Sequence, residues 1–269
     1  MNTGFVGMGS MGGMLVRALL RSGALAPKDV CVANRSPSKL AALAAEFPGV
    51  RLATNRELAA HCDLIFLCVN ASDLPAVLAQ MEAELYPGQL LVTMANVVRL
   101  QTLEDRVPCR VAKLIPSLTL EIDAGITLLM YGSRVADDDR KLLEELFGRI
   151  SRVVAISETQ ARPAISLTSG APALIAYVMQ SMAEEAAGNN SEITVEMALR
   201  LVQETATATL RLMDETEMTP QQVISRVAVP GGMTAMSLDI LSHHIPQAWR
   251  AVFKETAERE IKARKGLTL

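Results

Sequence analysis

Short apolar runs alternate with amphipathic stretches from the first residues to about Val154. The runs are continuous rather than alternating, as is typical of strands covered by helices on both faces. The predicted strands are Thr3–Val6, Val30–Ala33, Leu64–Val69, Leu90–Met94, Val111–Ile115, Ile126–Tyr131 and Arg152–Ala155. The predicted helices are Met11–Ser22, a helix after Ser36, Asp73–Leu85 and Asp137–Phe147. This order predicts an α/β fold with a mostly parallel, doubly wound sheet.

The pattern changes near Pro163, where strand signals almost disappear and helical spacing takes over. The predicted helices there are Pro163–Ala187, interrupted by Gly170 and Pro172, then Thr194–Leu212, Pro220–Ser225, Ala235–Ser242 and Gln247–Ala263. We therefore expect two domains, a Rossmann-type domain over residues 1–157 and an all-α domain over residues 158–269.

Gly7, Gly9 and Gly12 form G-x-G-x-x-G between the first predicted strand and the first predicted helix. In this context the first glycine allows a tight turn, the second lets the backbone approach a pyrophosphate, and the third lets helix and strand pack closely. The helix N-terminus would then face the phosphates. The alternative is a purely structural turn. The cofactor residues predicted here are Gly7, Met8, Gly9, Ser10, Met11 and Gly12.

The turn after the second strand indicates which dinucleotide is bound. NAD sites usually carry an acidic residue there, which accepts the ribose 2′-OH. This chain has Asn34, Arg35 and Ser36 instead, and these side chains can donate to a 2′-phosphate. We therefore expect NADP(H), with NAD(H) as the second option. Alternatively, Arg35 is a solvated turn residue and Ser36 only caps the following helix, in which Pro37 occupies the first turn.

Composition excludes several classes of protein. Half of the residues are hydrophobic, which argues against disorder, and no apolar run is long enough to span a membrane. The net charge is −3 and only 3% of residues are aromatic, without a basic stripe. We therefore expect a small-molecule substrate and neither a nucleic-acid nor a membrane partner.

The cysteines indicate the compartment. Cys31, Cys62, Cys68 and Cys109 lie on or beside predicted buried strands and form no C-x-x-C pair, so we expect reduced thiols in a cytoplasmic protein. Because the glycine motif begins at Gly7, we expect no signal peptide before it. The histidines lack the spacing of a metal site, and no metal is expected.

With these motifs in place, the chain resembles the pyrroline-5-carboxylate reductase family along essentially its whole length. The N-terminal G-F-V-G-M-G-S-M-G and the N-R-S turn look like that family's cofactor site, and the resemblance adds Val69 and Asn70 to it. Further along, Pro230–Thr234 resembles the family's S-P-G-G-x-T loop, and Trp249–Arg259 resembles the helix after it. The resemblance implies a helical dimerisation domain, and hence a homodimer or a higher homo-oligomer.

Several positions depart from the family pattern. Val229 replaces the serine before P-G-G, Met233 replaces a small residue, and Ser117 and Asn70 alter two further motifs. Within the family, the stretch Pro108–Thr119 is most similar to the late-competence ComER branch.

The resemblance implies hydride transfer from NADP(H) to a cyclic imine carboxylate, such as pyrroline-5-carboxylate. Gly231, Gly232, Met233 and Thr234 would bind the substrate, with the Thr234 hydroxyl near the imine nitrogen as the catalytic group. Val229 cannot supply a hydroxyl donor, which costs about 1–3 kcal/mol where a carboxylate oxygen stays unpaired.

Two other hypotheses deserve comparison. β-Hydroxyacid dehydrogenases begin similarly, but they need a lysine on the first long helix after the Rossmann domain, and no lysine occurs from Leu142 to Phe253. The substrate-loop departures keep a second alternative open, a non-catalytic NADP(H)-binding protein that acts as a sensor or an interaction partner.

Overall fold

The computed structural model describes residues 1–190 and 192–266, which divide into two compact units. The first unit holds residues 1–172 and the end of the last helix from Ala257 on, and the second holds residues 173–256. The domain boundary expected at residue 157 stays a prediction. The strands all belong to the first unit and are β1 Thr3–Val6, β2 Val30–Ala33, β3 Arg51–Leu52, β4 Leu64–Leu67, β5 Leu90–Thr93, β6 Arg110–Ile115, β7 Ile126–Tyr131 and β8 Arg152–Ala155.

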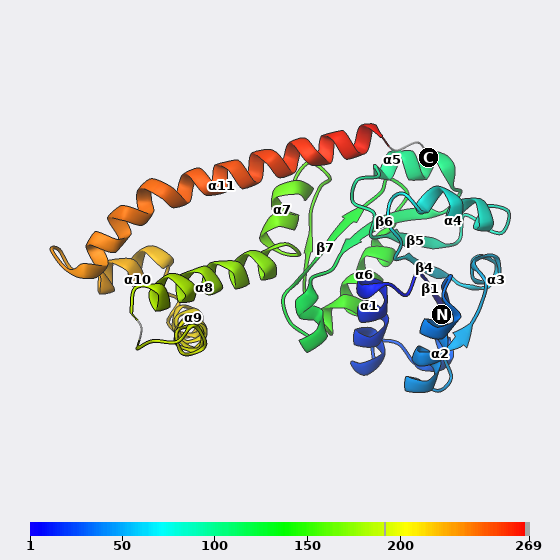
Figure 1. Ribbon diagram of the computed structural model, residues 1–269. Coiled ribbons are helices and arrows are strands. Elements are labelled where there is room, and N and C mark those ends of the chain that lie inside the picture. Colours follow the sequence, from blue (N-terminus) through cyan, green and yellow to red (C-terminus); the bar gives the residue numbers. More distant parts are fainter. Residues whose placement is uncertain (191, 267–269) are drawn as a thin grey trace. The chain divides into compact units, whose positions relative to one another are not determined.

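These strands form one eight-stranded sheet in the order β3-β2-β1-β4-β5-β6-β7-β8 (Figure 1). Every neighbouring pair is parallel except β6 and β7. The predicted α/β fold with a mostly parallel, doubly wound sheet is therefore confirmed. The chain order changes direction between β1 and β4, the kind of position where open α/β sheets bind ligands.

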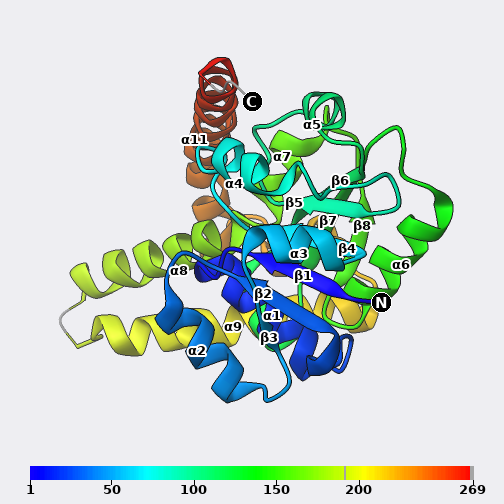
Figure 2. The same cartoon turned by 90° about the vertical axis from the view of Figure 1, so that its right-hand side faces the viewer.

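Helices cover both faces of this sheet (Figure 2). In the first unit they are α1 Ser10–Arg21, α2 Pro37–Glu46, α3 Asn55–His61, α4 Leu74–Met81, α5 Leu100–Arg106, α6 Asp137–Gly148 and α7 Ala161–Leu167, with short 3-10 turns η1 Pro27–Asp29 and η2 Leu118–Ile122. One apolar cluster joins the sheet to α1, α2 and α6, and a second joins the other face to α3, α4, α5 and α7. Burial on both faces explains why the strands are continuous apolar runs.

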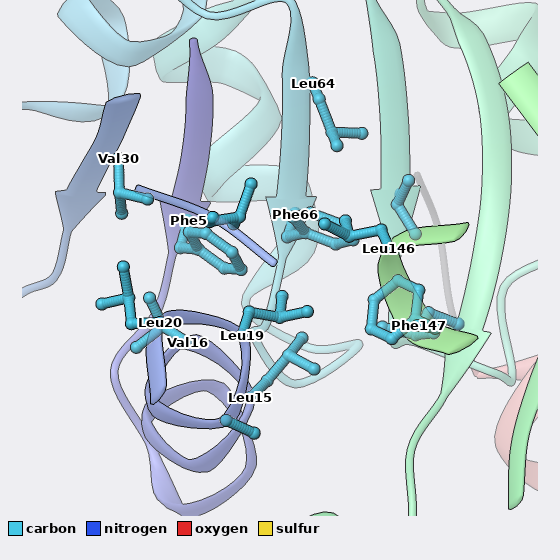
Figure 3. Close-up of a cluster of buried hydrophobic side chains, with 14 of the residues drawn as sticks. Phe5, Leu15, Val16, Leu19, Leu20, Val30, Leu64, Phe66, Leu146 and Phe147 are labelled. Atoms are coloured by element: carbon cyan, nitrogen blue, oxygen red, sulfur yellow. The ribbon is translucent and has the colours of Figure 1, made fainter. Parts of the chain in front are cut away.

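Aromatic rings fill the centre of the first cluster (Figure 3). Phe5 of β1 and Phe66 of β4 stack with ring centroids 4.8 Å apart, and Phe147 of α6 meets Phe66 edge-on at 5.8 Å. Each such pair contributes about 0.5–1.5 kcal/mol beyond the area that it buries. Leu15 and Leu19 of α1 are fully buried in the same cluster, which fixes α1 beneath β1 and β4.

The second unit contains helices and no described strand. They are α8 Ala171–Gly188, which begins at the end of the first unit, α9 Val195–Thr216, α10 Pro220–Val227 and α11 Met233–Lys265, whose last turns belong to the first unit. Between residues 173 and 256, Ala183 and Ala198 are buried, while many large apolar side chains remain more than a third exposed. No described helix is both long and apolar enough to cross a membrane.

Three expectations about individual elements need correction. The two last predicted helices are one helix, α11, which continues through Pro246 although proline lacks the N–H for an intrahelical hydrogen bond. Helices α3 and α5 were not predicted, because seven residues each are too few to show a helical period. Ser36 does occupy the position before α2, but its side chain makes no capping hydrogen bond and lies 3.3 Å from the Ser38 hydroxyl.

Candidate functional site

A cavity of about 470 Å³ opens at the carboxyl ends of β1, β2 and β4 in the first unit. Four segments line it: the glycine loop after β1, the turn after β2 with the start of α2, Asn55 at the start of α3, and the stretch from the end of β4 into α4. The cavity thus lies where the strand order changes direction. It brings together the predicted cofactor residues Gly7, Gly9, Ser10, Met11, Gly12, Asn34, Arg35, Ser36, Val69 and Asn70.

The three glycines each meet a different steric requirement. Gly7 has a φ of 97°, and a Cβ atom there would lie 2.7 Å from the Cys68 carbonyl oxygen. A Cβ on Gly12 would collide with the Gly7 carbonyl oxygen. Gly9, in contrast, has no atom within 4 Å of its hypothetical Cβ. The space in front of Gly9 is therefore open, as a bound pyrophosphate requires.

Helix α1 begins directly behind this space. Gly9 is its N-cap residue and has no side chain to occupy the free backbone N–H groups. The Gly9 carbonyl accepts the N–H of Gly13, so the N–H groups of Ser10, Met11 and Gly12 precede the first intrahelical bond. Unpaired donors and the positive end of the helix dipole suit a phosphate. The residues present thus fit the pyrophosphate of a dinucleotide.

Asn34 connects the glycine loop to the turn after β2. Its Oδ1 accepts the backbone N–H of Met8 at 3.0 Å, and its Nδ2 donates to the Ser36 carbonyl at 3.2 Å. Met8 itself is 5% exposed and does not line the cavity. Asn34 therefore holds two walls of the cavity at a fixed separation.

Arg35 and Lys39 supply positive charge to the cavity, and Asp73 supplies negative charge. The Arg35 Nη2 atom lies 3.4 Å from Asp73 Oδ2, although the Arg35 side chain is 89% exposed. Lys39, Asp73, Asn55 and Gln80 were not predicted as site residues. Asn55 and Gln80 bond to each other at 2.9 Å. Only Lys39 had a local signal, since it follows the N-R-S turn by one helical turn.

The β4 side of the cavity is less polar. Val69 and Asn70 follow Cys68, whose backbone N–H donates to the Val6 carbonyl at 2.8 Å. Burial raises the pKa of the Cys68 thiol to about 12, so this thiol is protonated near neutral pH and is not a nucleophile. Among the described residues, no group of three or more His, Cys, Asp and Glu side chains could hold a metal ion.

The predicted substrate residues lie in the second unit, at the N-terminus of α11. Gly231 has a φ of 77°, which favours glycine, and the Gly232 N–H donates to the Val229 carbonyl at 3.0 Å. Met233 and Thr234 form the first helical turn, and both are exposed. Since α11 is a long helix, its first N–H groups can receive a carboxylate.

Two family models match consecutive parts of the chain. Residues 2–97 match the family described as NADP oxidoreductase coenzyme F420-dependent. Residues 158–263 match the family described as pyrroline-5-carboxylate reductase dimerisation. The second match indicates that the helical half of the chain is a dimerisation domain.

Relatives cover nearly the entire chain. ComE operon protein 4 of Bacillus subtilis is 27% identical over 95% of this chain and 94% of its own length. Pyrroline-5-carboxylate reductase 3 of the same organism is 29% identical over 95% and 94%. The structure of a pyrroline-5-carboxylate reductase from Coxiella burnetii, 26% identical, superposes with a TM-score of 0.81 over 100% of this chain and 98% of that one. Together with the two family models, these matches show that the chain is similar to pyrroline-5-carboxylate reductases along nearly its whole length.

Proposed function

We propose that this protein is an NADP(H)-dependent reductase of the pyrroline-5-carboxylate reductase type, which reduces the C=N bond of a cyclic imine carboxylate. The product would be proline or a related cyclic amino acid. The observation that carries the proposal is the cavity at the carboxyl ends of β1, β2 and β4, which combines an open glycine cradle, a helix N-terminus and two basic side chains.

The cofactor half of the proposal assigns one task to each wall. The free N–H groups at the start of α1 would bind the pyrophosphate, and Arg35 and Lys39 would bind the 2′-phosphate. Asn34 would keep these two walls in register through Met8 and Ser36. Val69 and Asn70 would line the path toward the nicotinamide. NADPH, when bound, supplies the hydride for the imine carbon.

The substrate half rests on residues 230–234. The backbone N–H groups of Gly231 and Met233 would anchor the substrate carboxylate at the start of a long helix, while the Gly232 N–H is held by the Val229 carbonyl. The Thr234 hydroxyl would donate a hydrogen bond to the imine nitrogen, and the hydride of the cofactor together with a proton taken up from water would convert the C=N bond to an amine. Holding the two reactants in this geometry supplies much of the acceleration that such a reaction needs.

We also propose a homodimer in the cytoplasm. The second unit leaves large apolar side chains exposed along α8, α9 and α11, among them Tyr177, Met182, Leu201, Met236 and Ile240. A surface of this kind on a dimerisation domain suits a second copy of the chain. The cytoplasm is supported by four free cysteines, three of them buried.

One observation favours a second candidate, a non-catalytic NADP(H)-binding protein. Val229 is 59% exposed at the loop that should hold the substrate, and Met233 is 76% exposed beside it. Neither side chain can donate a hydrogen bond to a carboxylate. ComE operon protein 4 is one of the relatives, and its name does not describe a reductase.

Steady-state oxidation of NADPH with pyrroline-5-carboxylate distinguishes the two candidates. The reductase should turn over, and Val229→Ser should lower its KM by restoring a donor, about 5- to 150-fold if one unpaired oxygen is satisfied. Thr234→Val should lower kcat. NADPH binding without turnover in the wild type and in Val229→Ser would support the non-catalytic protein instead.

A further inference from the structure

Asp73 occupies an unusual position for an acidic residue at the start of a helix. It is the N-cap residue of α4, where aspartate ordinarily accepts a backbone N–H of the first turn, yet it makes no capping hydrogen bond. Its carboxylate instead lies 3.4 Å from the Arg35 guanidinium, which comes from the turn after β2. Both residues line the dinucleotide cavity.

The charges around this part of the cavity are few. Among the described lining residues, Arg35 and Lys39 are basic and Asp73 is acidic. A phosphate monoester carries about −1.5 to −2 charges near neutral pH. The carboxylate of Asp73 therefore repels a 2′-phosphate and also competes with it for Arg35.

The same carboxylate suits the unphosphorylated cofactor. In NAD sites the 2′-OH of the ribose donates to an acidic side chain at the tip of the second strand. The turn after β2 has no acid of its own, but Asp73 reaches the same region from α4 through its contact with Arg35. An acid in that region should make the affinity for NADH, relative to NADPH, higher than the N-R-S turn alone predicts.

We propose that Asp73 is a specificity-determining residue that reduces the preference for NADP(H) over NAD(H) by pairing with Arg35 in the dinucleotide cavity. This inference rests on the proposed binding of NADP(H) in that cavity. In the free protein Asp73 neutralises Arg35, and a 2′-phosphate has to displace it. NADH binds without that displacement, and its ribose 2′-OH finds an acceptor.

The test is calorimetric binding of NADPH, NADH, adenosine 2′,5′-bisphosphate and 5′-AMP to the wild type and to Asp73→Asn at low salt. Asparagine keeps the size and removes the charge. Exposed ion pairs are worth about a 1.4- to 5-fold change in an equilibrium constant, and the lost repulsion adds to this. We expect Asp73→Asn to bind NADPH and the bisphosphate about 5-fold more tightly, with NADH and AMP unchanged or weaker. The gain should shrink at high salt.

The matched control is Asp138→Asn, which removes the same charge from a side chain that is 99% exposed and does not line the cavity. It should leave the ratio of NADPH to NADH affinity unchanged. An equal gain in NADPH affinity in this control would overturn the proposed role of Asp73. So would a ratio of NADPH to NADH affinity in Asp73→Asn that stays within twofold of wild type. Either result would leave the proposed binding of NADP(H) intact. Failure of the wild type to bind either dinucleotide would overturn the cofactor proposal as well.

Discussion

The side-chain oxygen of Asn34 accepts the backbone N–H of Met8 at 3.0 Å, and so the turn after β2 is tied to the glycine loop after β1. The other end of the same amide donates to the Ser36 carbonyl. Asn34 therefore acts on the shape of the cavity, whereas Arg35 acts on its charge. The two neighbours should respond differently to substitution.

Asn34→Ala should weaken NADPH and NADH by similar factors. The change removes two hydrogen bonds, each worth about 0.5–1.5 kcal/mol, and releases both walls of the cavity. We expect a loss of about 5-fold or more for each dinucleotide, measured by titration of nicotinamide fluorescence. Arg35→Asp is the comparison, and it should weaken NADPH far more than NADH. Loss of NADPH alone in Asn34→Ala would mean that Asn34 contacts the 2′-phosphate directly.

Gly9→Ala and Gly12→Ala should separate binding from stability. A methyl group at Gly9 meets nothing within 4 Å, and the φ of −71° accepts alanine, so the protein should unfold at the wild-type temperature. The methyl group would fill the space proposed for the pyrophosphate, and NADPH binding should fall at least about tenfold, or 1.4 kcal/mol.

Gly12→Ala should instead lower the free energy of unfolding, because its methyl group would collide with the Gly7 carbonyl oxygen. Overpacking of this kind costs about 1–3 kcal/mol. Thermal and urea unfolding of both variants measure the difference. Wild-type NADPH affinity in Gly9→Ala would place the pyrophosphate elsewhere.

Glu260 should anchor the end of α11 to the first unit. Its side chain is 7% exposed and binds Arg162 at 3.3 Å, Arg264 at 2.5 Å and the Asn96 amide at 3.2 Å. Glu260→Ala leaves two guanidinium groups without this partner. We expect a loss of about 2 kcal/mol in urea unfolding, less than for a fully buried pair because both arginines are partly exposed. Glu258→Ala, at an exposed position of the same helix, should change stability by less than about 0.5 kcal/mol.

The Cys109 thiol should make the protein less stable in alkali. Burial raises its pKa from the ordinary 9.0 to about 11. Above pH 9 the thiol ionises in the unfolded chain but stays protonated in the folded protein, so stability present below pH 9 is lost as the pH rises toward 11. The loss is about 1.4 kcal/mol per pH unit.

Cys109→Ala should be less stable than wild type at pH 7, because it creates a small cavity at a fully buried position. The difference should then narrow as the pH rises above 9, in urea unfolding measured at a series of pH values. Val107→Ala is the matched control, since it creates a cavity nearby without removing a titrating group. Parallel curves for wild type and Cys109→Ala would contradict the raised pKa.

The chain should not exist as a monomer in solution, because of its second unit. Its exposed apolar side chains on α8, α9 and α11 need cover that the unit itself does not give them. Sedimentation at low micromolar concentration should therefore give at least twice the 28.9 kDa chain mass. A mass of one chain would argue against the dimer and would also leave the dimerisation domain without its expected role.

Much of the first unit follows from local patterns. The strands at Thr3–Val6, Val30–Ala33, Ile126–Tyr131 and Arg152–Ala155 are predicted at their observed bounds, because continuous apolar runs between turn signals are a local property. Helix α3 was missed although Thr54 and Glu57 form a capping box at its start, a signal that could have located it. The continuation of α11 through Pro246 was missed because a proline within a helical pattern usually ends or kinks the helix.

The candidate site also combines features that local sequence reveals with a contact that only the fold creates. The glycine motif and the N-R-S turn were recognisable because their conformational and hydrogen-bonding demands involve neighbours in the chain. The turn after β2 itself contains no acidic residue, as the sequence shows. Asp73 nevertheless lies against Arg35, 38 residues away, because β1 places the ends of β2 and β4 on either side of the cavity.

Local sequence therefore determined the type of sheet, the glycine cradle and the family resemblance, since each depends on residue identity at short spacing. The fold alone determined which distant side chains share the cavity and how their charges balance. Strand order decides this, because pairing in a parallel sheet joins segments that no short-range pattern relates. The cofactor preference that we propose depends on both, with Arg35 recognisable in the sequence and Asp73 placed beside it by the folded structure.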